Sequence, residues 1–160
     1  MHPEAHAAAV QAAYELTSWA PAWLVGGPLI VLTVVLHVLG LGATRAAHRY
    51  AVGRRAHLIH NQVLNFAVIM SLITFMVTLL HIMQAAIWAV TYILVGAAPN
   101  GHHAMLYSLS AMTSYGHAEV FLDPRWQMLG AIEALNGVIL IGLSTAFLFT
   151  MIQQSWQNHH

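Results

Sequence analysis

A short polar run, TSYGHAE at residues 113–119, interrupts a chain that is otherwise strongly apolar. Three interpretations of it are open. The backbone carbonyl groups of such a stretch can replace the hydration shell of a permeating ion. His117 could instead bind a metal, because neutral imidazole is the commonest metal ligand in proteins. In the third interpretation the run is an external loop with neither role, so the segments on either side of it must decide.

Histidines at membrane depth form a second candidate set. The chain contains 12 histidines and no cysteine, which excludes disulfides and thiolate metal sites. His37 lies midway along the first long apolar segment and His81 lies within the second. Together with His117 they could hold haem or a metal ion. The simpler interpretation, which we favour, is that each one forms hydrogen bonds to a neighbouring helix.

Glu133 is an acid inside the last apolar segment, where ionisable residues are rare and usually functional or paired. Helical spacing places it on one face with Asn136 and Gly137. These residues could form a polar site beside an ion pathway. Alternatively, Glu133 is a buried structural acid, either protonated or hydrogen-bonded to hydroxyl groups such as those of Ser108 or Ser110. Gly137 could be a hinge or a position of close helix packing.

The composition restricts the class of protein. Hydrophobic residues make up 59% of the 160 residues and charged residues only 6%, against roughly 25% charged residues in a typical soluble domain. This difference indicates a membrane protein. The formal net charge is zero, so nothing favours a nucleic-acid partner. We also find no nucleophile–base pair and no glycine-rich phosphate loop, so we expect neither an enzyme nor a small-molecule substrate.

Residues 1–57 are expected to hold a short surface helix, a first membrane span and a connector. The surface helix is predicted over 4–19 and the span over 22–43, with Pro28 near its start. The connector, 44–57, contains four of the five arginines, at positions 45, 49, 54 and 55. By the positive-inside rule it lies in the cytoplasm, which places the N-terminus outside.

Residues 58–155 are expected to form a second unit. Residues 58–97 contain no proline, no formal charge and no glycine before Gly96, so we favour one long tilted helix over two shorter ones. Residues 102–112 are apolar but reach only about 16 Å as a helix, roughly half of the membrane core. Asn100 is a plausible N-cap for them. Residues 126–152 are long enough for a last span. Irregular backbone at membrane depth is tolerated only inside protein or beside a water-filled cavity.

This order of span, half-helix, extended stretch and span leads to a resemblance. The runs LYSLSAMTSYGHAEV and PRWQMLGAIEALNGVILIGLSTAFLF resemble the pore loop and inner helix of bacterial one-pore-loop potassium channels, in particular the small ion-channel-domain proteins. The matching positions in the first run are Ser108, Leu109, Thr113 and Gly116. Those in the second run are Leu129, Gly130, Ala131, Glu133, Ala134, Asn136 and Gly137. The resemblance covers about residues 60–155.

The resemblance implies a role for each residue of the run. Thr113, Ser114, Tyr115, Gly116, His117 and Ala118 would form the ion filter. Glu119 would lie at the pore mouth. His117 stands at the position of the usual filter tyrosine and Ala118 at that of the second filter glycine. Potassium selectivity therefore does not follow from the resemblance.

Taken together, we expect an all-α membrane protein with three crossing helices, a re-entrant pore helix and a filter loop. The expected function is a passive cation channel, with K+ as the permeant ion and no cofactor. One pore loop cannot enclose a filter, so the resemblance implies a homotetramer in a lipid bilayer. The expected location is the bacterial plasma membrane, with the C-terminus in the cytoplasm. A haem- or metal-binding membrane protein that uses the intramembrane histidines is the alternative.

Overall fold

The computed structural model describes the backbone of residues 3–55, 62–116 and 120–157, and side chains within these ranges. Its helices are α1 (Pro3–Arg55), α2 (Gln62–Leu94), α3 (Gly101–Met112) and α4 (Gln127–Gln157). A single 3-10 turn, η1 (Pro124–Trp126), precedes α4. The described part of the chain is therefore all-helical, as the sequence predicted.

Three helices are long and apolar enough to cross a membrane. The qualifying stretches are Trp19–Tyr50, Val63–Leu94 and Pro124–Gln154, each of 31 or 32 residues. A span needs about 20 apolar residues. Large apolar side chains such as Leu24 and Val63 are exposed along their outer faces, as expected of surfaces in contact with lipid. These properties are those of a multi-pass membrane protein.

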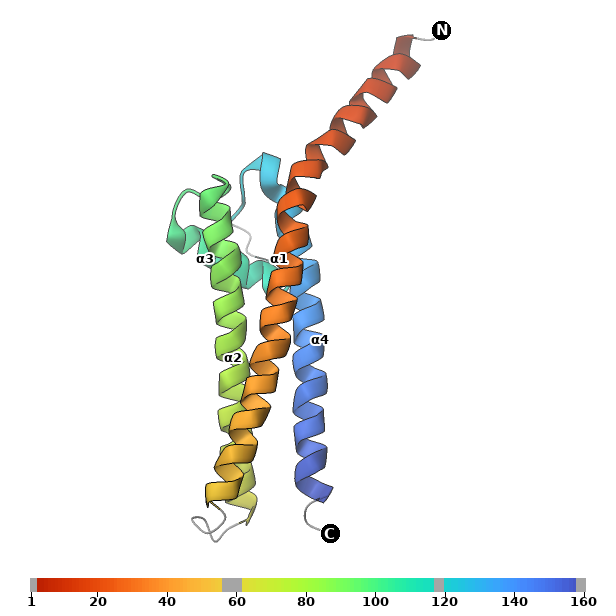
Figure 1. The fold of residues 1–160 in the computed structure, drawn as a ribbon. Helices are drawn as coiled ribbons and strands as arrows, with labels where there is room; N and C mark the ends of the chain where they lie inside the picture. Colours follow the sequence, from red (N-terminus) through yellow and green to blue (C-terminus); the bar gives the residue numbers. More distant parts are fainter. Residues whose placement is uncertain (1–2, 56–61, 117–119, 158–160) are drawn as a thin grey trace.

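Helix α1 differs from its prediction. Instead of a surface helix, a separate span and an Arg-rich connector, one helix of 53 residues runs from Pro3 to Arg55. Both Pro21 and Pro28 lie inside it. Proline removes one helical hydrogen bond and commonly bends a helix rather than ending it. Accordingly, the N-terminal part of α1 leans away from the other helices (Figure 1). The boundary predicted between residues 19 and 22 is therefore wrong.

Helix α2 confirms the prediction of one long helix for the residues that the structure describes. It extends without interruption over 33 residues, from Gln62 to Leu94. Residues 58–61, with which the predicted helix began, lie outside the described ranges. The helix ends at Leu94, and Gly96, two residues later, has a left-handed backbone angle, φ = 71°. Glycine adopts this angle without steric cost, which explains why the chain turns here.

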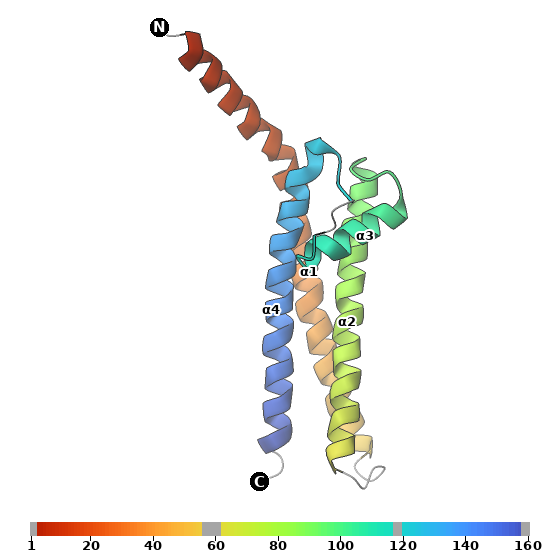
Figure 2. The same cartoon turned by 180° about the vertical axis from the view of Figure 1, so that it is seen from behind.

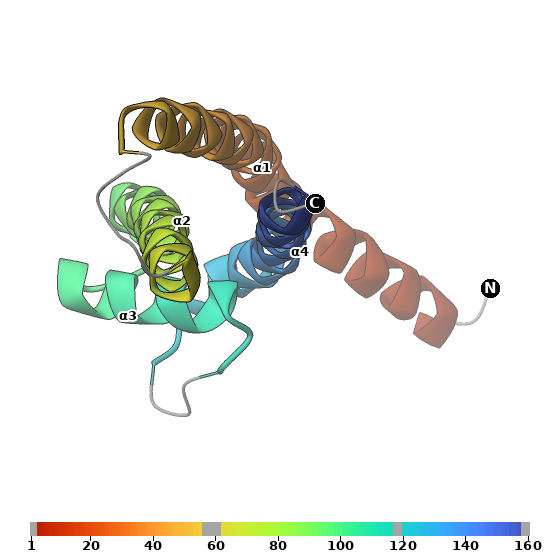
Figure 3. The same cartoon turned by 90° about the horizontal axis from the view of Figure 1, so that it is seen from below.

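The long helices lie side by side, and α3 runs across them rather than along them (Figures 1 and 2). Seen from below, α1 lies on one side of the pair formed by α2 and α4, and α3 lies on the other side (Figure 3). The N-terminus and α3 are near one end of the bundle, and the C-terminus is at the opposite end (Figure 1).

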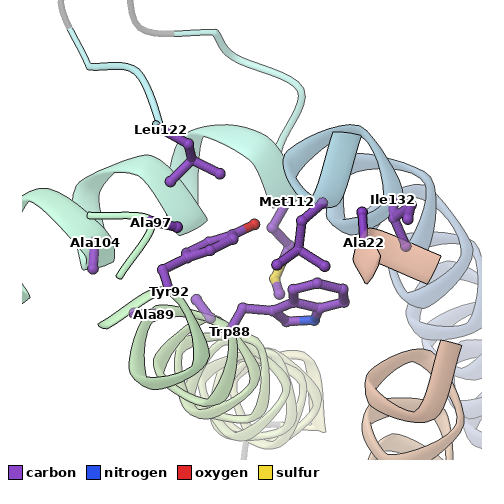
Figure 4. Packing of buried hydrophobic residues seen from close by; sticks show 11 residues of the cluster. Ala22, Trp88, Ala89, Tyr92, Ala97, Ala104, Met112, Leu122 and Ile132 are labelled. Carbon is purple, nitrogen blue, oxygen red and sulfur yellow. The ribbon is translucent and has the colours of Figure 1, made fainter. Parts of the chain in front are cut away.

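The apolar core is concentrated at the end of the bundle that holds α3. Trp88 and Tyr92 from α2 are fully buried there, next to Met112 at the end of α3 (Figure 4). Ala22 from α1 and Ile132 from α4 close the opposite side (Figure 4). The main cluster of buried apolar residues thus includes residues of the short helix, which is the element that positions the candidate site.

Candidate functional site

The short helix α3 is defined by a cap at each end. The Asn100 side chain accepts a hydrogen bond from the backbone N–H of His103 at 2.9 Å, which confirms the predicted N-cap. Thr113 is the C-cap, and its backbone N–H donates to the carbonyl group of Leu109. With 12 residues the helix is about 18 Å long. It is therefore too short to cross a membrane and agrees with the prediction for 102–112.

The chain leaves the bundle for α3 and returns to the same place. The backbone N–H of Asp123, just before η1, donates to the carbonyl oxygen of Ala97, just after α2, at 2.9 Å. A second link joins the His103 ring Nε2 to the Phe121 carbonyl oxygen at 3.3 Å. The whole excursion from 98 to 122 is thus closed at its base by hydrogen bonds between its two ends.

Glycines allow α3 to lie directly against α4. A Cβ atom added at Gly137 would lie 2.7 Å from the Met112 Cα and closer still to the Met112 carbonyl oxygen. At Gly130 an added Cβ would collide with the Tyr107 ring, whose Cζ would be 2.8 Å away. Of the two roles considered for Gly137, close helix packing is therefore the one that this structure supports.

Glu133 joins three helices through hydrogen bonds. One carboxyl oxygen, Oε2, is hydrogen-bonded to the Tyr92 hydroxyl of α2, and the other, Oε1, contacts the Ser108 hydroxyl of α3. All three side chains are fully buried. The contact with Ser108 was one of the pairings considered from the sequence. The Tyr92 partner was missed, because Tyr92 is 41 residues away and only the fold brings it close.

The first part of the polar run forms a turn. Ser114 donates its backbone N–H to Ala111 O at 3.0 Å, and Tyr115 donates to Ser110 O at 2.9 Å. These two bonds, with Ser114 at φ = 54°, form a Schellman motif that ends α3. Residues 113–115 are therefore coiled onto the helix end rather than extended. The extended stretch expected after α3 does not begin here, because the backbone N–H groups of Ser114 and Tyr115 are hydrogen-bonded to the last carbonyl groups of α3.

The polar run is only partly described. Thr113 to Gly116 are exposed, and Gly116 also has a left-handed angle, φ = 66°. The predicted site residues His117, Ala118 and Glu119 lie outside the described residues. A hollow of about 390 Å³ lies beside the run. Its walls come from α3, the turn and α4, and include Tyr107, Ala111, Ser114, Gly116, Gln127 and Ala131.

A second polar cluster connects the three long helices near the middle of the bundle. Gln84 of α2 donates to the Thr33 carbonyl oxygen at 3.1 Å, and its amide nitrogen lies 2.9 Å from His37 Nδ1. On the other side of the imidazole, His37 Nε2 lies 2.9 Å from the Ser144 hydroxyl of α4. Asn136 completes the cluster by donating to the Thr33 hydroxyl at 2.8 Å. Asn136 and Glu133 lie on one face of α4 but have different partners. Asn136 contacts Thr33, whereas Glu133 contacts Tyr92 and Ser108.

The structure brings together His37 and His81, two of the three histidines of the predicted metal site. They are not arranged so that both could bind one metal ion. The rings of His37 and His81 are 5.0 Å apart and nearly perpendicular. Both ring nitrogens of His37 already have hydrogen-bond partners. The Nδ1 atom of His81 lies 2.9 Å from the Val77 carbonyl oxygen, and its buried Nε2 has no partner within the described part of the chain. Within the same residues, no group of three metal-ligating side chains is present. This geometry favours the interpretation of His37 as a helix-connecting residue.

The chain matches no protein-family model, no curated protein and no solved structure. The resemblance to one-pore-loop potassium channels accordingly stays a prediction from the residues quoted above. What the structure adds is independent of it: a capped half-length helix, closed at its base and packed against α4 through Gly137.

The central polar cluster gives a testable prediction. We expect His37→Leu to lower the free energy of unfolding by about 1 kcal/mol, since hydrogen bonds between helices in membranes contribute roughly 0.6 to 1.7 kcal/mol. Titration of the purified protein with SDS in mixed micelles would measure it. Thr145→Ala is the matched control, because Thr145 is exposed and bonds only within its own helix. Equal stability of His37→Leu and wild type would contradict a connecting role.

Proposed function

We propose that this chain is the subunit of a passive cation channel, in which α3 is a re-entrant pore helix and residues 113–119 form the ion pathway. The observation that carries the proposal is the closed excursion between α2 and α4. A half-length helix enters at one end of the bundle and the chain returns to the same end, where Asp123 is bonded to Ala97. A loop of this kind at membrane depth requires protein or a water-filled cavity around it.

The direction of α3 supports a cation rather than an anion. Its C-terminal end, which carries the negative end of the helix dipole, lies against α4 beside the exposed residues 113–116. A cation in front of this end would be stabilised. Glu119 would add a negative charge at the mouth and raise the local concentration of cations. Backbone carbonyl groups would then replace water around the ion.

One chain supplies only one such loop, so the proposal requires several copies around a common axis. We propose a homotetramer with cyclic symmetry. The hollow is lined by residues of α3, the turn and α4. Helix α3 lies on the side of the bundle opposite α1, so α1 leaves this side available to neighbouring copies (Figure 3). Exposed apolar residues on α4, including Leu135 and Val138, would face the neighbours or the cavity.

The filter would have to change its conformation on assembly. In the single chain, Ser114 and Tyr115 are held in the turn that ends α3. A row of carbonyl groups around an ion requires an extended backbone, so this turn must open when four loops meet. His117 and Ala118 replace the residues expected in a potassium filter. The proposal is therefore a cation channel, without assigned selectivity for potassium.

Orientation and location are part of the proposal. Arg45 and Arg49 belong to the C-terminal part of α1. This part of α1 runs towards the end of the bundle opposite α3 (Figure 1). With that end in the cytoplasm, the N-terminus and the pore mouth face outwards and the C-terminus faces inwards. The proposed location is the bacterial plasma membrane, by the resemblance to bacterial channels.

The deciding experiment is a measurement of reversal potentials across liposomes or planar bilayers that contain the purified protein. Under separate potassium, sodium and proton gradients, we expect currents that reverse at the potential of one or more cations. Mass measurement of the protein in mild detergent should give four subunits. A stable monomer that carries no ion flux would overturn the proposal.

The turn at Ser114 offers a sharper test of the same proposal. In the dissociated subunit, where the turn is closed, Ser114→Gly should raise the free energy of unfolding by about 1 kcal/mol, because a residue with a Cβ atom pays roughly that amount for a left-handed angle. A more stable turn opposes the opening that the filter requires, so ion flux should fall about fivefold. Thr113→Gly is the stability control: Thr113 has φ = −89°, so glycine there should destabilise. Unchanged stability of the dissociated Ser114→Gly subunit would contradict the observed turn, and unchanged flux would contradict its opening in the channel.

A further inference from the structure

The buried contacts of Glu133 allow its protons to be counted. Three contacts between oxygen atoms form a chain at this point. Tyr92 Oη meets Glu133 Oε2, Glu133 Oε1 meets Ser108 Oγ, and Ser108 Oγ lies 2.8 Å from the carbonyl oxygen of Ala85. All four residues are fully buried. Each contact at hydrogen-bond distance needs one proton between its two oxygens, so the chain needs three.

The neighbouring groups supply only two of these protons. The tyrosine hydroxyl has one and the serine hydroxyl has one, whereas the carbonyl group of Ala85 can only accept. If Glu133 were a carboxylate, Ser108 could donate to Glu133 or to Ala85, but not fully to both. One of two close contacts between buried oxygens would then lack a proton, which is costly away from water. The missing proton has one remaining source, the carboxyl group itself.

We propose that Glu133 is a neutral carboxylic acid that donates its proton to Ser108 Oγ. Ser108 then donates to the Ala85 carbonyl oxygen, and Tyr92 donates to the other oxygen of Glu133. Every group in the chain is satisfied in this arrangement, and α3 is fixed to α2 and α4 at once. Glu133 is thus a positioning residue for α3. That it thereby positions an ion filter rests on the proposed function, whereas its protonation does not.

The other titratable groups near these hydrogen bonds are consistent with a neutral Glu133. Tyr92 is its partner on α2, and Tyr107 of α3 packs its ring 5.5 Å from that of Tyr92, edge to face. Both phenols are neutral at ordinary pH. The two hydrogen-bond partners of the carboxyl group are therefore uncharged hydroxyls. A neutral acid needs no counter-charge, and among the described residues the groups bonded to this carboxyl group are hydroxyls rather than cations.

Infrared spectroscopy tests the protonation directly. The full chain, labelled with ¹³C at its glutamate carboxyl groups, is compared with labelled Glu133→Gln in lipid at neutral pH. We expect the difference spectrum to contain the C=O stretch of one protonated carboxylic acid. Difference bands of a carboxylate alone would overturn the proposal.

A second variant tests the partner of that proton. In Ser108→Ala the acid loses its acceptor, so the carboxylic C=O band should remain but shift to higher frequency. Ser144→Ala, which alters a buried serine bonded to His37 instead, should leave the band in place. A band that does not move in Ser108→Ala would overturn the assigned donor and acceptor.

Measurements of ion flux and of unfolding test the positioning role of Glu133 separately from the proposed channel function. The amide of Glu133→Gln can donate to Ser108 and accept from Tyr92, so this variant should unfold near the wild-type midpoint and keep its ion flux. Glu133→Leu should unfold earlier, and its flux should be lost. If Glu133→Gln were as unstable as Glu133→Leu, the positioning role would be wrong. If wild-type protein carried no flux while the protonated band was present, the proposed function would fail and this assignment would stand.

Discussion

Gly137→Ala should lower the free energy of unfolding by about 3 kcal/mol, the upper part of the range for overpacked cores. The reason is the kind of neighbour that the new methyl group meets. It would collide with the backbone of Met112, at the end of α3. A backbone atom cannot rotate away, so α3 or α4 must move as a whole. Titration with SDS in mixed micelles would measure the loss.

Two other glycines of α4 provide matched controls. At Gly142 an added Cβ would meet nothing within 4 Å, so Gly142→Ala should be neutral or stabilise the helix by up to about 1 kcal/mol. At Gly130 the obstacle is the Tyr107 side chain, which can move, so Gly130→Ala should have an intermediate effect. If Gly137→Ala were as stable as Gly142→Ala, close packing would be excluded and the hinge interpretation of Gly137 would regain support.

The sequence predicted the elements that depend on the residues of a single segment. The half-length helix followed from an apolar run too short to span, bounded by Asn100, and the structure places it at Gly101–Met112. The single helix α2 followed from the absence of turn residues near the middle of 58–97. In both cases length, polarity and capping are local properties, so they could be read without knowledge of the fold.

The sequence failed where a local signal was overridden or where the partner was distant. The sequence predicted a boundary between residues 19 and 22 and an end of the first span at 43, yet one helix passes through both positions. The acid at Glu133 was recognised as unusual, but its partner Tyr92 lies on another helix. Ser144 likewise gave no signal before the fold placed it next to His37. Contacts of this kind depend on how helices are rotated against each other, which no single segment specifies.

Most consequential for the site is the turn at residues 113–115. The composition of the run indicated an irregular backbone, and the resemblance implied an extended one. In the single chain the end of α3 instead captures the N–H groups of Ser114 and Tyr115. A helix end leaves its last carbonyl groups without partners, and the nearest backbone donors satisfy them. An extended filter therefore needs interactions that only an assembly can supply.

Trp88→Ala should be about as damaging as Gly137→Ala, for the opposite reason: it would leave a void. Trp88 is fully buried, and Figure 4 shows its indole next to Met112 and directed towards Ala22 and Ile132. Loss of this ring removes the packing beneath the end of α3. Removal of a buried aromatic ring costs about 3 to 5 kcal/mol in soluble proteins. We expect about 3 kcal/mol in SDS titration, because dispersion contacts are lost in a membrane protein as well.

Trp88→Phe separates the ring from its polar atom. The indole Nε1 is buried and has no partner within the described residues, so no hydrogen bond is lost with it. Only the smaller ring should count, with a loss of about 1.5 kcal/mol.

Because the chain has no cysteine, Met112→Cys can report on α3 through its reaction with a maleimide. The reaction of the cysteine at position 112 should be slow when residue 88 is Trp or Phe and fast when it is Ala. Equal rates in all three backgrounds would show that α3 keeps its place without the ring, and its position would then depend on Gly137 and Glu133.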